Sequence, residues 1–317
     1  MVSPGILLVD KPAGLTSHDV VARTRRAFGT RKVGHAGTLD PMATGLLVIG
    51  IEGATRLLTY IVGADKTYAA TIRLGQTTSS DDADGDIVRQ ADPEAWSAVT
   101  DDAVAAGIAA LTGEISQVPS SVSAIKVDGE RAYDLARDGE VVELAPRPVE
   151  IHHLTLVDQP DNDRAVFEAE CGKGTYVRAL ARDMGRILGT FGHICALRRT
   201  LVGPFSENDM IPLDQLEALC DRAASGEGSL ADALMPVETA LDDIPALAVT
   251  RADAARLHRG QAVLLRGRDA PTSSGTVYVT VAGRLLALAE VGNGEIIPKR
   301  VFNLTGLTAS SGRNERN

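Results

Sequence analysis

The sequence predicts an α+β protein that ends in a small module built mainly of strands. Residues 67–74 alternate apolar and polar side chains, the pattern of a half-buried strand. Residues 177–188 repeat apolar side chains with the period of a helix that buries one face. Residues 277–301 contain three short strand patterns, the first two separated by Ala282-Gly283. The length of 317 residues suits about two domains.

The N-terminal elements follow from short apolar runs and helix signals. Ser17 is a suitable N-cap for a helical pattern, and Gly29 is a suitable stop for it. Three glycines and an Asp-Pro pair make residues 31–45 loop-like. The elements expected here are a buried strand at residues 6–9, a helix from Ser17 to Phe28, a loop at 31–45 and strands at 46–51 and 67–74.

The middle of the chain contains an acidic turn and a long polar insertion. Residues 81–86 carry four aspartates, but no register supplies the ligand set of an EF-hand. Residues 114–148 are polar and turn-rich, which indicates a mobile functional insertion with a short helix near Tyr133 to Arg137. The other expected elements are a helix capped by Thr100, a strand at 165–171, a helix from Val177 to Leu188 ended by Gly189 and a loop at 222–230.

We expect a domain boundary at Ile244-Pro245. Thr250 and Asp253 form a capping box for a short helix that ends at His258. The predicted organisation is a main domain at residues 1–244 with the insertion at 114–148, a small β module at 245–303 and a disordered tail at 304–317. The strands expected in the module are 277–281, 284–291 and 296–301.

Composition excludes several classes of protein. Apolar residues make up 44% and charged residues 23% of the chain, which is typical of globular proteins. No apolar run reaches the ~18 residues that a membrane span needs, so we expect a cytoplasmic protein. The three cysteines match no zinc spacing, and the six histidines include no zinc-binding pair. The sequence therefore predicts no metal site.

The charge is unevenly distributed. The net charge is −10, yet residues 172–202 hold six basic residues against the single acid Asp183. Residues 245–303 hold eight basic and four acidic residues. Clustered positive charge on an acidic protein is compatible with a polyanionic partner, although a solvated basic helix face has the same appearance.

Two glycine-rich segments are the candidates for chemistry. Residues 34–45 surround Asp40, a possible catalytic carboxylate, although an Asp-Pro pair also starts many short helices. The turn that contains Lys173 lacks the glycines of a P-loop or a dinucleotide fingerprint. It leads into a helix that carries Tyr176 and Arg178, and its backbone amides together with Lys173 are able to hold a phosphate.

Five motifs appear in order along the chain, and the second is the longest and most specific. They are Lys11-Pro12-x-Gly14-x-Thr16-Ser17, Gly34-His35-Ala36-Gly37-Thr38-Leu39-Asp40-Pro41-x-Ala43-Thr44-Gly45, Lys66-Thr67-Tyr68, Gly172-Lys173-Gly174-Thr175-Tyr176-Val177-Arg178 and Leu197-Arg198-Arg199. Together these motifs resemble the TruB type of bacterial tRNA pseudouridine-55 synthases. The resemblance covers residues 5–205 well and extends loosely to 303.

The resemblance implies an isomerase that converts a uridine in the tRNA T-loop to pseudouridine without cofactor or metal. It implies a mixed, mainly antiparallel sheet with flanking helices and a C-terminal PUA-like module. The implied catalytic residues are Asp40, Tyr68, which stacks on the target base, and Arg178, which pairs with Asp40. Whether Asp40 attacks C1′, attacks C6 or removes a sugar proton is left open. The implied RNA-contacting residues are His35, Tyr176, Leu197, Lys11, Lys173, Arg198 and Arg199.

The implied partner is the T-arm of tRNA, with no guide RNA and no membrane, and a monomer is the expected state. Three alternatives are a guide-dependent synthase of the dyskerin type, a non-catalytic RNA-binding or chaperone protein with the same fold, and a metal-free N-glycosidase that uses Asp40. The long insertion favours the stand-alone bacterial type over the guide-dependent synthase. The presence of Asp40, Tyr68 and Arg178 disfavours a non-catalytic protein. The motifs offer no second acid for an N-glycosidase.

Overall fold

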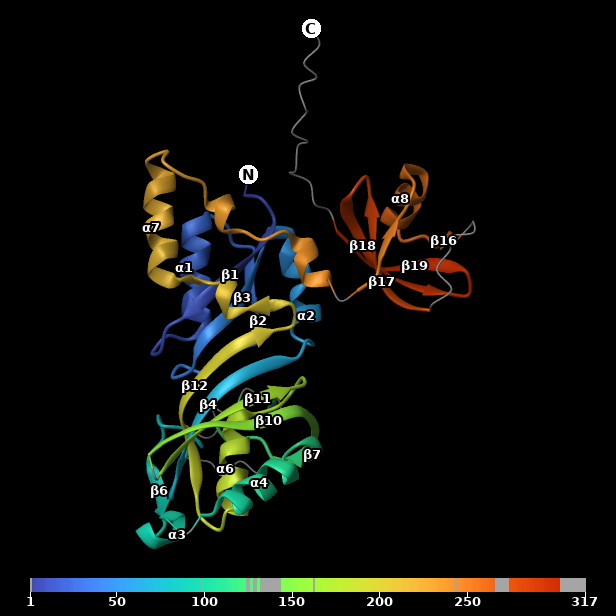
Figure 1. Ribbon diagram of the computed structural model, residues 1–317. Coiled ribbons are helices and arrows are strands. Elements are labelled where there is room, and N and C mark those ends of the chain that lie inside the picture. Colours follow the sequence, from blue (N-terminus) through green and yellow to red (C-terminus); the bar gives the residue numbers. More distant parts are fainter. Residues whose placement is uncertain are drawn as a thin grey trace.

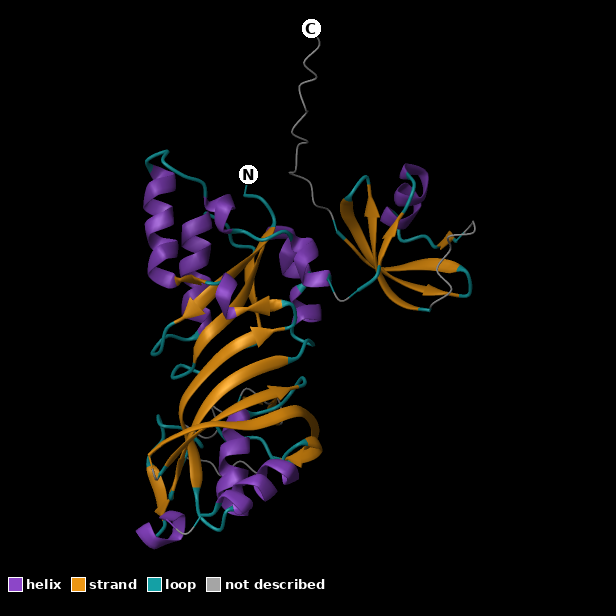
Figure 2. Cartoon of the chain, viewed as in Figure 1, coloured by secondary structure: helices purple, strands orange, loops and turns teal. Residues whose placement is uncertain are grey.

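The computed structural model describes residues 2–97, 99–123, 126–127, 130–131, 144–161, 163–242, 244–265 and 274–302. A ten-stranded sheet runs through the main body, and a separate five-stranded sheet follows it (Figures 1 and 2). The helix predicted near Tyr133 to Arg137 and the tail at 304–317 lie outside the described residues. No described helix is long and apolar enough to cross a membrane.

The large sheet is mixed and mainly antiparallel, as expected. Its order is β14-β1-β3-β12-β4-β11-β10-β7, with β2 beside β3 and β13 beside β12. Only the β1–β14 and β3–β12 pairs are parallel among its described pairings. The strands are β1 Gly5–Lys11, β2 Val33–Ala36, β3 Thr44–Ile51, β4 Lys66–Leu74, β7 Gly113–Gln117, β10 Arg147–Asp161, β11 Arg164–Cys171, β12 Gly192–Val202, β13 Phe205–Ser206 and β14 Ile211–Pro212.

The strand predictions are largely confirmed. β4 alternates buried and half-buried residues along its whole length. The continuous apolar run of β1 is buried on both faces, because Leu7 and Val9 enter one core cluster while Ile6 and Leu8 enter another. Two expectations are wrong in part. Residues 31–45 include β2, which pairs with the next strand β3, and the insertion at 114–148 includes most of β7 and the start of β10, which pair with each other.

The helices cover the two ends of the large sheet. α1 and α7 pack together at one end, and α4 and α6 pack together at the other (Figure 1). The loop predicted at 222–230 begins later than expected, because α7 continues to Ala224. The α-helices of this domain are α1 Ser17–Phe28, α2 Leu58–Ile61, α3 Pro93–Ser97, α4 Asp101–Ala110, α6 Val177–Ile187 and α7 Leu213–Ala224, and the 3₁₀ turns are η1 Glu52–Arg56, η2 Glu207–Asp209, η3 Leu230–Ala233 and η4 Val237–Leu241.

The cap of α1 lies one residue earlier than predicted. Thr16, not Ser17, is the N-cap: its hydroxyl accepts from the backbone N–H of Asp19, and the Asp19 carboxylate accepts from the backbone N–H of Thr16. The Ser17 hydroxyl is buried and bonds to both the N–H and the C=O of Leu39. Ser17 therefore ties α1 to the loop that carries Asp40. Gly29 ends the helix in the left-handed conformation, as predicted.

Two short hairpins lie outside the large sheet. β5 (Gln76–Thr78) pairs with β6 (Ile87–Gln90), and the acidic turn at residues 81–86 connects them. β8 (Lys126–Val127) pairs with β9 (Glu130–Arg131) inside the insertion. The first hairpin places the acidic turn against β12, because the N–H of Ile194 donates to the carbonyl of Asp81.

The C-terminal module is a five-stranded sheet with one helix, close to prediction. Its order is β15-β17-β18-β19-β16, and α8 packs against β18 and β19. Leu285, Leu288 and Phe302 of the module share a core cluster with Leu241 and Ile244 of the main body. The two sheets are therefore joined by apolar packing as well as by the chain. The elements are β15 Ala246–Ala248, α8 Arg251–His258, β16 Val263–Leu264, β17 Gly275–Val281, β18 Arg284–Gly292 and β19 Glu295–Val301.

Gly45 gives the first testable prediction. It has φ +94°, and a Cβ there would lie 2.3 Å from the carbonyl oxygen of Arg199 on the paired strand. Gly14 has a similar φ of +82° but no atom within 4 Å of its Cβ position. Gly14→Ala should cost about 1 kcal/mol of unfolding free energy from backbone strain. Gly45→Ala should cost about 3 kcal/mol or more, because a steric clash is added. Urea unfolding of both variants measures the difference, and equal losses would contradict the close packing of β3 on β12.

Candidate active site

The loop between β2 and β3 carries Asp40 and is held from two sides. The backbone N–H of Gly14 donates to the carbonyl of Pro41 at 2.8 Å, and Ser17 holds Leu39 as described above. Leu39 and Ala43 are buried in the same core cluster. Both anchors are backbone or short-side-chain bonds, so the position of Asp40 is fixed by the first turn of α1 and the segment before it.

Lys11 is the third anchor of this loop. Its side chain is fully buried, and its ammonium donates to the carbonyls of Pro12, Leu15 and Pro41 at 2.9, 2.6 and 3.2 Å. Burial lowers the pKa of Lys11 to about 8, although the Asp40 carboxylate opposes the shift. Because all three ammonium donors are used inside the protein, the structure does not place Lys11 as the direct RNA contact that the sequence predicted.

Arg178 and Asp40 form a two-point ion pair. Nε of Arg178 lies 3.0 Å from Oδ2 of Asp40, and Nη2 lies 3.2 Å from Oδ1. The Arg178 side chain is 6% exposed, whereas the Asp40 side chain is 36% exposed. Burial raises the pKa of Asp40 above its ordinary value, and the Arg178 guanidinium opposes that shift. Arg178 therefore both orients the carboxylate and favours its ionised form.

The remaining donors of Arg178 bind two further segments. Nη1 donates to the carbonyl of Ser80 at 3.0 Å and lies 3.3 Å from Oδ2 of Asp82. Nη2 donates to the carbonyl of Val122 at 2.9 Å. Asp82 is a site residue that the sequence reasoning missed, because the acidic turn was considered only as a calcium loop. A buried arginine needs more than one partner for its N–H groups. That requirement was the available signal that Arg178 has an acceptor besides Asp40.

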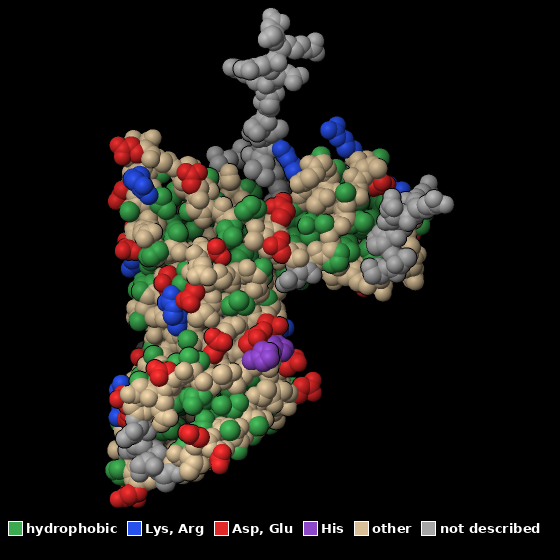
Figure 3. All heavy atoms as spheres, in the orientation of Figure 1, with side chains coloured by type: hydrophobic (Ala, Val, Ile, Leu, Met, Phe, Trp, Pro, Cys, Tyr) green, Lys and Arg blue, Asp and Glu red, His purple; other side chains and the backbone are tan. Residues whose placement is uncertain are grey.

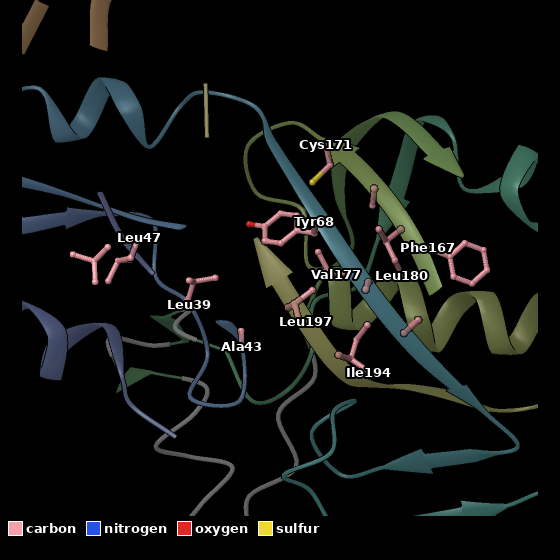
Figure 4. Close-up of a cluster of buried hydrophobic side chains, with 14 of the residues drawn as sticks. Leu39, Ala43, Leu47, Tyr68, Phe167, Cys171, Val177, Leu180, Ile194 and Leu197 are labelled. Atoms are coloured by element: carbon pink, nitrogen blue, oxygen red, sulfur yellow. The ribbon is translucent and has the colours of Figure 1, made fainter. Parts of the chain in front are cut away.

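Tyr68 lies in the core beside this ion pair. Its side chain is 9% exposed, and burial raises the pKa of the phenol. Figure 4 shows the ring between Cys171 and Leu197, with the hydroxyl directed toward the side on which Leu39 and Ala43 lie. The structure thus brings Tyr68 and Leu197 together, and both share the core cluster with two neighbours of Asp40 in the loop.

An open pocket of about 530 Å³ lies next to the Asp40 loop. Pro41 and Met42 line it on one side, and Asp84 of the acidic turn lines it on another. Leu197 and Arg198 are the predicted site residues that reach it. Ala69 and Thr71 contribute from β4, on the strand face opposite Tyr68, so Tyr68 does not line this pocket. Asp84 is a second carboxylate near Asp40 that the motifs did not reveal.

Three other predicted residues frame the site. Tyr176 is the N-cap of α6, and its backbone N–H donates to the buried side chain of Gln117 at 2.8 Å. Lys173 is exposed on the turn before it. The ring of His35 meets the ring of His18 edge-on at 5.7 Å, and burial lowers the pKa of His35. This shift favours the neutral form of the His35 imidazole.

The basic cluster predicted at residues 172–202 is mostly neutralised inside the protein. Arg198 pairs with Asp10 through two bonds and with Glu207 through one. Arg199 is 1% exposed and donates to the carbonyls of Leu46 and Gly37, so it stabilises β3 and the Asp40 loop rather than meeting RNA directly. On the face shown in Figure 3, acidic and basic side chains are interspersed. Much of the positive charge counted in this part of the sequence is therefore paired within the fold, by Asp10 and Glu207 at Arg198 and by Asp81 at Arg182.

The structure offers no group of three or more metal-ligating side chains among its described residues. Cys171 is buried, and burial raises the pKa of its thiol to about 11. The described site brings together an oriented carboxylate, a guanidinium and a phenol whose pKa is raised by burial.

Comparison with known proteins identifies two matching family models. Residues 25–177 match the N-terminal domain of the TruB family of pseudouridylate synthases, and residues 178–242 match the C-terminal domain of tRNA pseudouridylate synthase B. A tRNA pseudouridine synthase B from Bradyrhizobium diazoefficiens is 72% identical over 99% of this chain and 90% of its own length. The protein of the same name from Caulobacter vibrioides is 49% identical over 95% of this chain and 96% of its own length.

Solved structures share the fold at lower sequence identity. A chain from an H/ACA ribonucleoprotein bound to a substrate RNA is 24% identical, with a TM-score of 0.71 over 94% of this chain and 84% of its own. A chain of the archaeal Nop10–Cbf5 complex is also 24% identical, with a TM-score of 0.70 over 95% of this chain and 86% of its own. These structures support the fold assignment.

The electrostatics of Asp40 give a prediction that needs no assay of activity. The carboxyl of Asp40 should titrate above 3.8, because burial disfavours its charged form. Arg178→Gln should raise this pKa further, since it removes the stabilising positive charge. Asp82→Asn should lower it, since Asp82 is a neighbouring negative charge. Carboxyl ¹³C NMR titration measures the pKa of Asp40 in the wild type and in the two variants. A lower pKa in Arg178→Gln together with a higher pKa in Asp82→Asn would contradict the described geometry.

Proposed function

The chain belongs to the TruB family of pseudouridylate synthases, and from this premise we propose that it converts uridine 55 in the T-loop of tRNA to pseudouridine, with Asp40 as the catalytic carboxylate. The chain is a tRNA pseudouridine synthase by its similarity to relatives of that name over 90% and 83% of their own length. The observation that carries the role of Asp40 is its two-point contact with a buried guanidinium.

The proposed reaction leaves the composition of the nucleotide unchanged. The N1–C1′ bond breaks, the uracil turns within the site, and a C5–C1′ bond forms. C5 then loses its proton and N1 gains one. An ionised, oriented carboxylate suits each of the three possible first steps, which are attack on C1′, attack on C6 and removal of a sugar proton. Arg178 supports all three, because it favours the ionised form of Asp40 and orients both oxygens.

The base must leave the helical stack before these atoms can be reached. We propose that His35 occupies space near the flipped nucleotide and that Tyr68 stacks on the target base. The raised pKa of the Tyr68 phenol favours a stacking role over one as a phenolate base. Tyr176 and Leu197 are proposed to line the base pocket, on the strength of their positions beside Arg178 and Tyr68.

Binding of the rest of the tRNA is proposed to use exposed cations and the C-terminal module. Lys173 is exposed next to α6, and Arg198 keeps 37% of its side chain exposed beside the open pocket. The PUA-like module at 245–303 carries an excess of basic residues. We propose that the protein acts as a monomer on tRNA in the cytoplasm, without a guide RNA.

Removal of the Asp40 carboxylate tests the proposed chemistry. Asp40→Asn should abolish pseudouridine formation on unmodified tRNA, because an amide of the same shape is neither nucleophile nor base. The tRNA dissociation constant and the unfolding midpoint should stay near those of the wild type. Turnover within about tenfold of the wild-type rate, a loss of only ~1.4 kcal/mol of barrier reduction, would remove Asp40 from the catalytic role.

Substitution of Arg178 tests the two-point contact separately. Arg178→Lys should lose at least about 100-fold in single-turnover rate at saturating tRNA, because lysine keeps the charge but cannot hold both carboxylate oxygens. Arg178→Ala should lose only slightly more. A surface arginine that bound phosphate would instead weaken tRNA binding and leave the saturated rate nearly normal. A lysine variant within about threefold of the wild-type rate would show that bidentate orientation is unnecessary.

A further inference from the structure

Another largely buried arginine, Arg182, lies one helical turn after Arg178 on α6. Its side chain is 12% exposed. Nη1 lies 3.2 Å from Oδ2 of Asp81, and Nη2 donates to the carbonyl of Val118 at 2.7 Å. Nε and Nη2 also bind the carboxylate of Asp183 on the same helix. None of these groups belongs to the motifs that identify the family.

The contacts of Arg182 repeat those of Arg178 one turn away. Arg178 binds Asp82 and the carbonyl of Val122, whereas Arg182 binds Asp81 and the carbonyl of Val118. Residues four apart on a helix are about 6 Å apart along its axis. The helix therefore holds the acidic turn and the segment at residues 117–123 at two points each. The Ser120 hydroxyl links these two segments directly by donating to the carbonyl of Ser80 at 3.0 Å.

The backbone conformation of Asp81 connects the contacts of Arg182 to those of Arg178. Asp81 has φ +61°, a conformation that non-glycine residues adopt only at a cost in free energy. Asp82 follows directly, so the direction of its carboxylate depends on the backbone of Asp81. Arg182 on one side and the N–H of Ile194 on the other hold Asp81 in this conformation.

We propose that Arg182 is a positioning residue for the reaction: through Asp81 and Val118 it holds the turn and segment that supply Arg178 with Asp82, Ser80 and Val122, and so keeps Arg178 aligned on Asp40. This inference rests on the proposed function, because it assigns Arg182 a part in that same chemistry. Loss of Arg182 leaves Asp81 buried without its cation. That carboxylate then competes with Asp40 and Asp82 for the guanidinium of Arg178.

The test uses the full-length protein and unmodified tRNA transcript. Arg182→Gln should lower the single-turnover rate at saturating tRNA by about tenfold to 100-fold, as small misplacements of reacting groups do. The tRNA dissociation constant should stay within about twofold, since Arg182 is not a phosphate contact in this proposal. Arg182→Gln/Asp81→Asn should recover part of the lost rate, because asparagine tolerates positive φ and carries no unpaired charge.

A matched control lies one turn further along the same helix. Arg186 also pairs with Asp183, but its side chain is 66% exposed. Arg186→Gln should leave the single-turnover rate at saturating tRNA unchanged. Thermal unfolding of every variant confirms that the assay temperature lies well below the transition.

Several outcomes would overturn the proposal. An Arg182→Gln rate within about threefold of wild type, a loss confined to tRNA affinity, or no recovery in the double variant would each do so. If Arg182→Gln does not fold, Arg182→Lys keeps the buried charge balanced but cannot reach all its partners, and a wild-type rate in that variant overturns the proposal. A wild-type protein without activity on tRNA would instead contradict the proposed function.

Discussion

The burial of the Arg178 guanidinium is the constraint on which the rest of the site depends. Its side chain is 6% exposed, and it contacts the Asp40 loop, the acidic turn and the segment after β7. A buried cation is tolerated only when its charge and its N–H groups are matched. Each of these three segments therefore fixes the others through one side chain, and displacement of any of them leaves a buried charge or carbonyl without a partner.

Helix α6 links this constraint to the core of the sheet. Its apolar residues Val177, Leu180 and Met184 are buried in the main core cluster, which also contains Tyr68 and Leu197. The arginines project from the same helix toward the acidic turn. Because α6 carries both the buried apolar residues and the arginines, the packing of the core sets the distance from Arg178 to Asp40. The candidate catalytic geometry is thus a property of the hydrophobic core as much as of the loop that bears the carboxylate.

Sequence patterns predicted much of the local structure, and the motifs singled out Asp40 and Arg178, which the fold brings into contact. The N-cap at Thr250, the stop at Gly29 and the alternation of residues 67–74 are local signals that the fold preserves. At Thr250 the hydroxyl accepts from the backbone N–H of Asp253 and donates to its carboxylate, which is a cap rather than the reciprocal capping box predicted. The cap of α1 was displaced by one residue because Ser17 bonds to Leu39, a contact 22 residues away. The pairings of Arg198 with Asp10 and of Arg178 with Asp82 span still larger separations. Nothing in a linear charge count distinguishes an arginine that folds onto such an acid from one that faces solvent.

The difference between internally paired and solvent-facing arginines matters for how an acidic RNA-modifying protein binds its substrate. Arginines that appear as a basic cluster in the sequence are used to hold strands and loops together, as Arg199 does between β12 and the Asp40 loop. Arg199 is buried and cannot contact a phosphate while those bonds persist, so direct phosphate contacts are left to exposed cations such as Lys173. In the proposed function, a preorganised site for the flipped nucleotide contributes to recognition beside those exposed cations. A buried, fully paired arginine favours such a site, because its planar donors fix directions as well as charge.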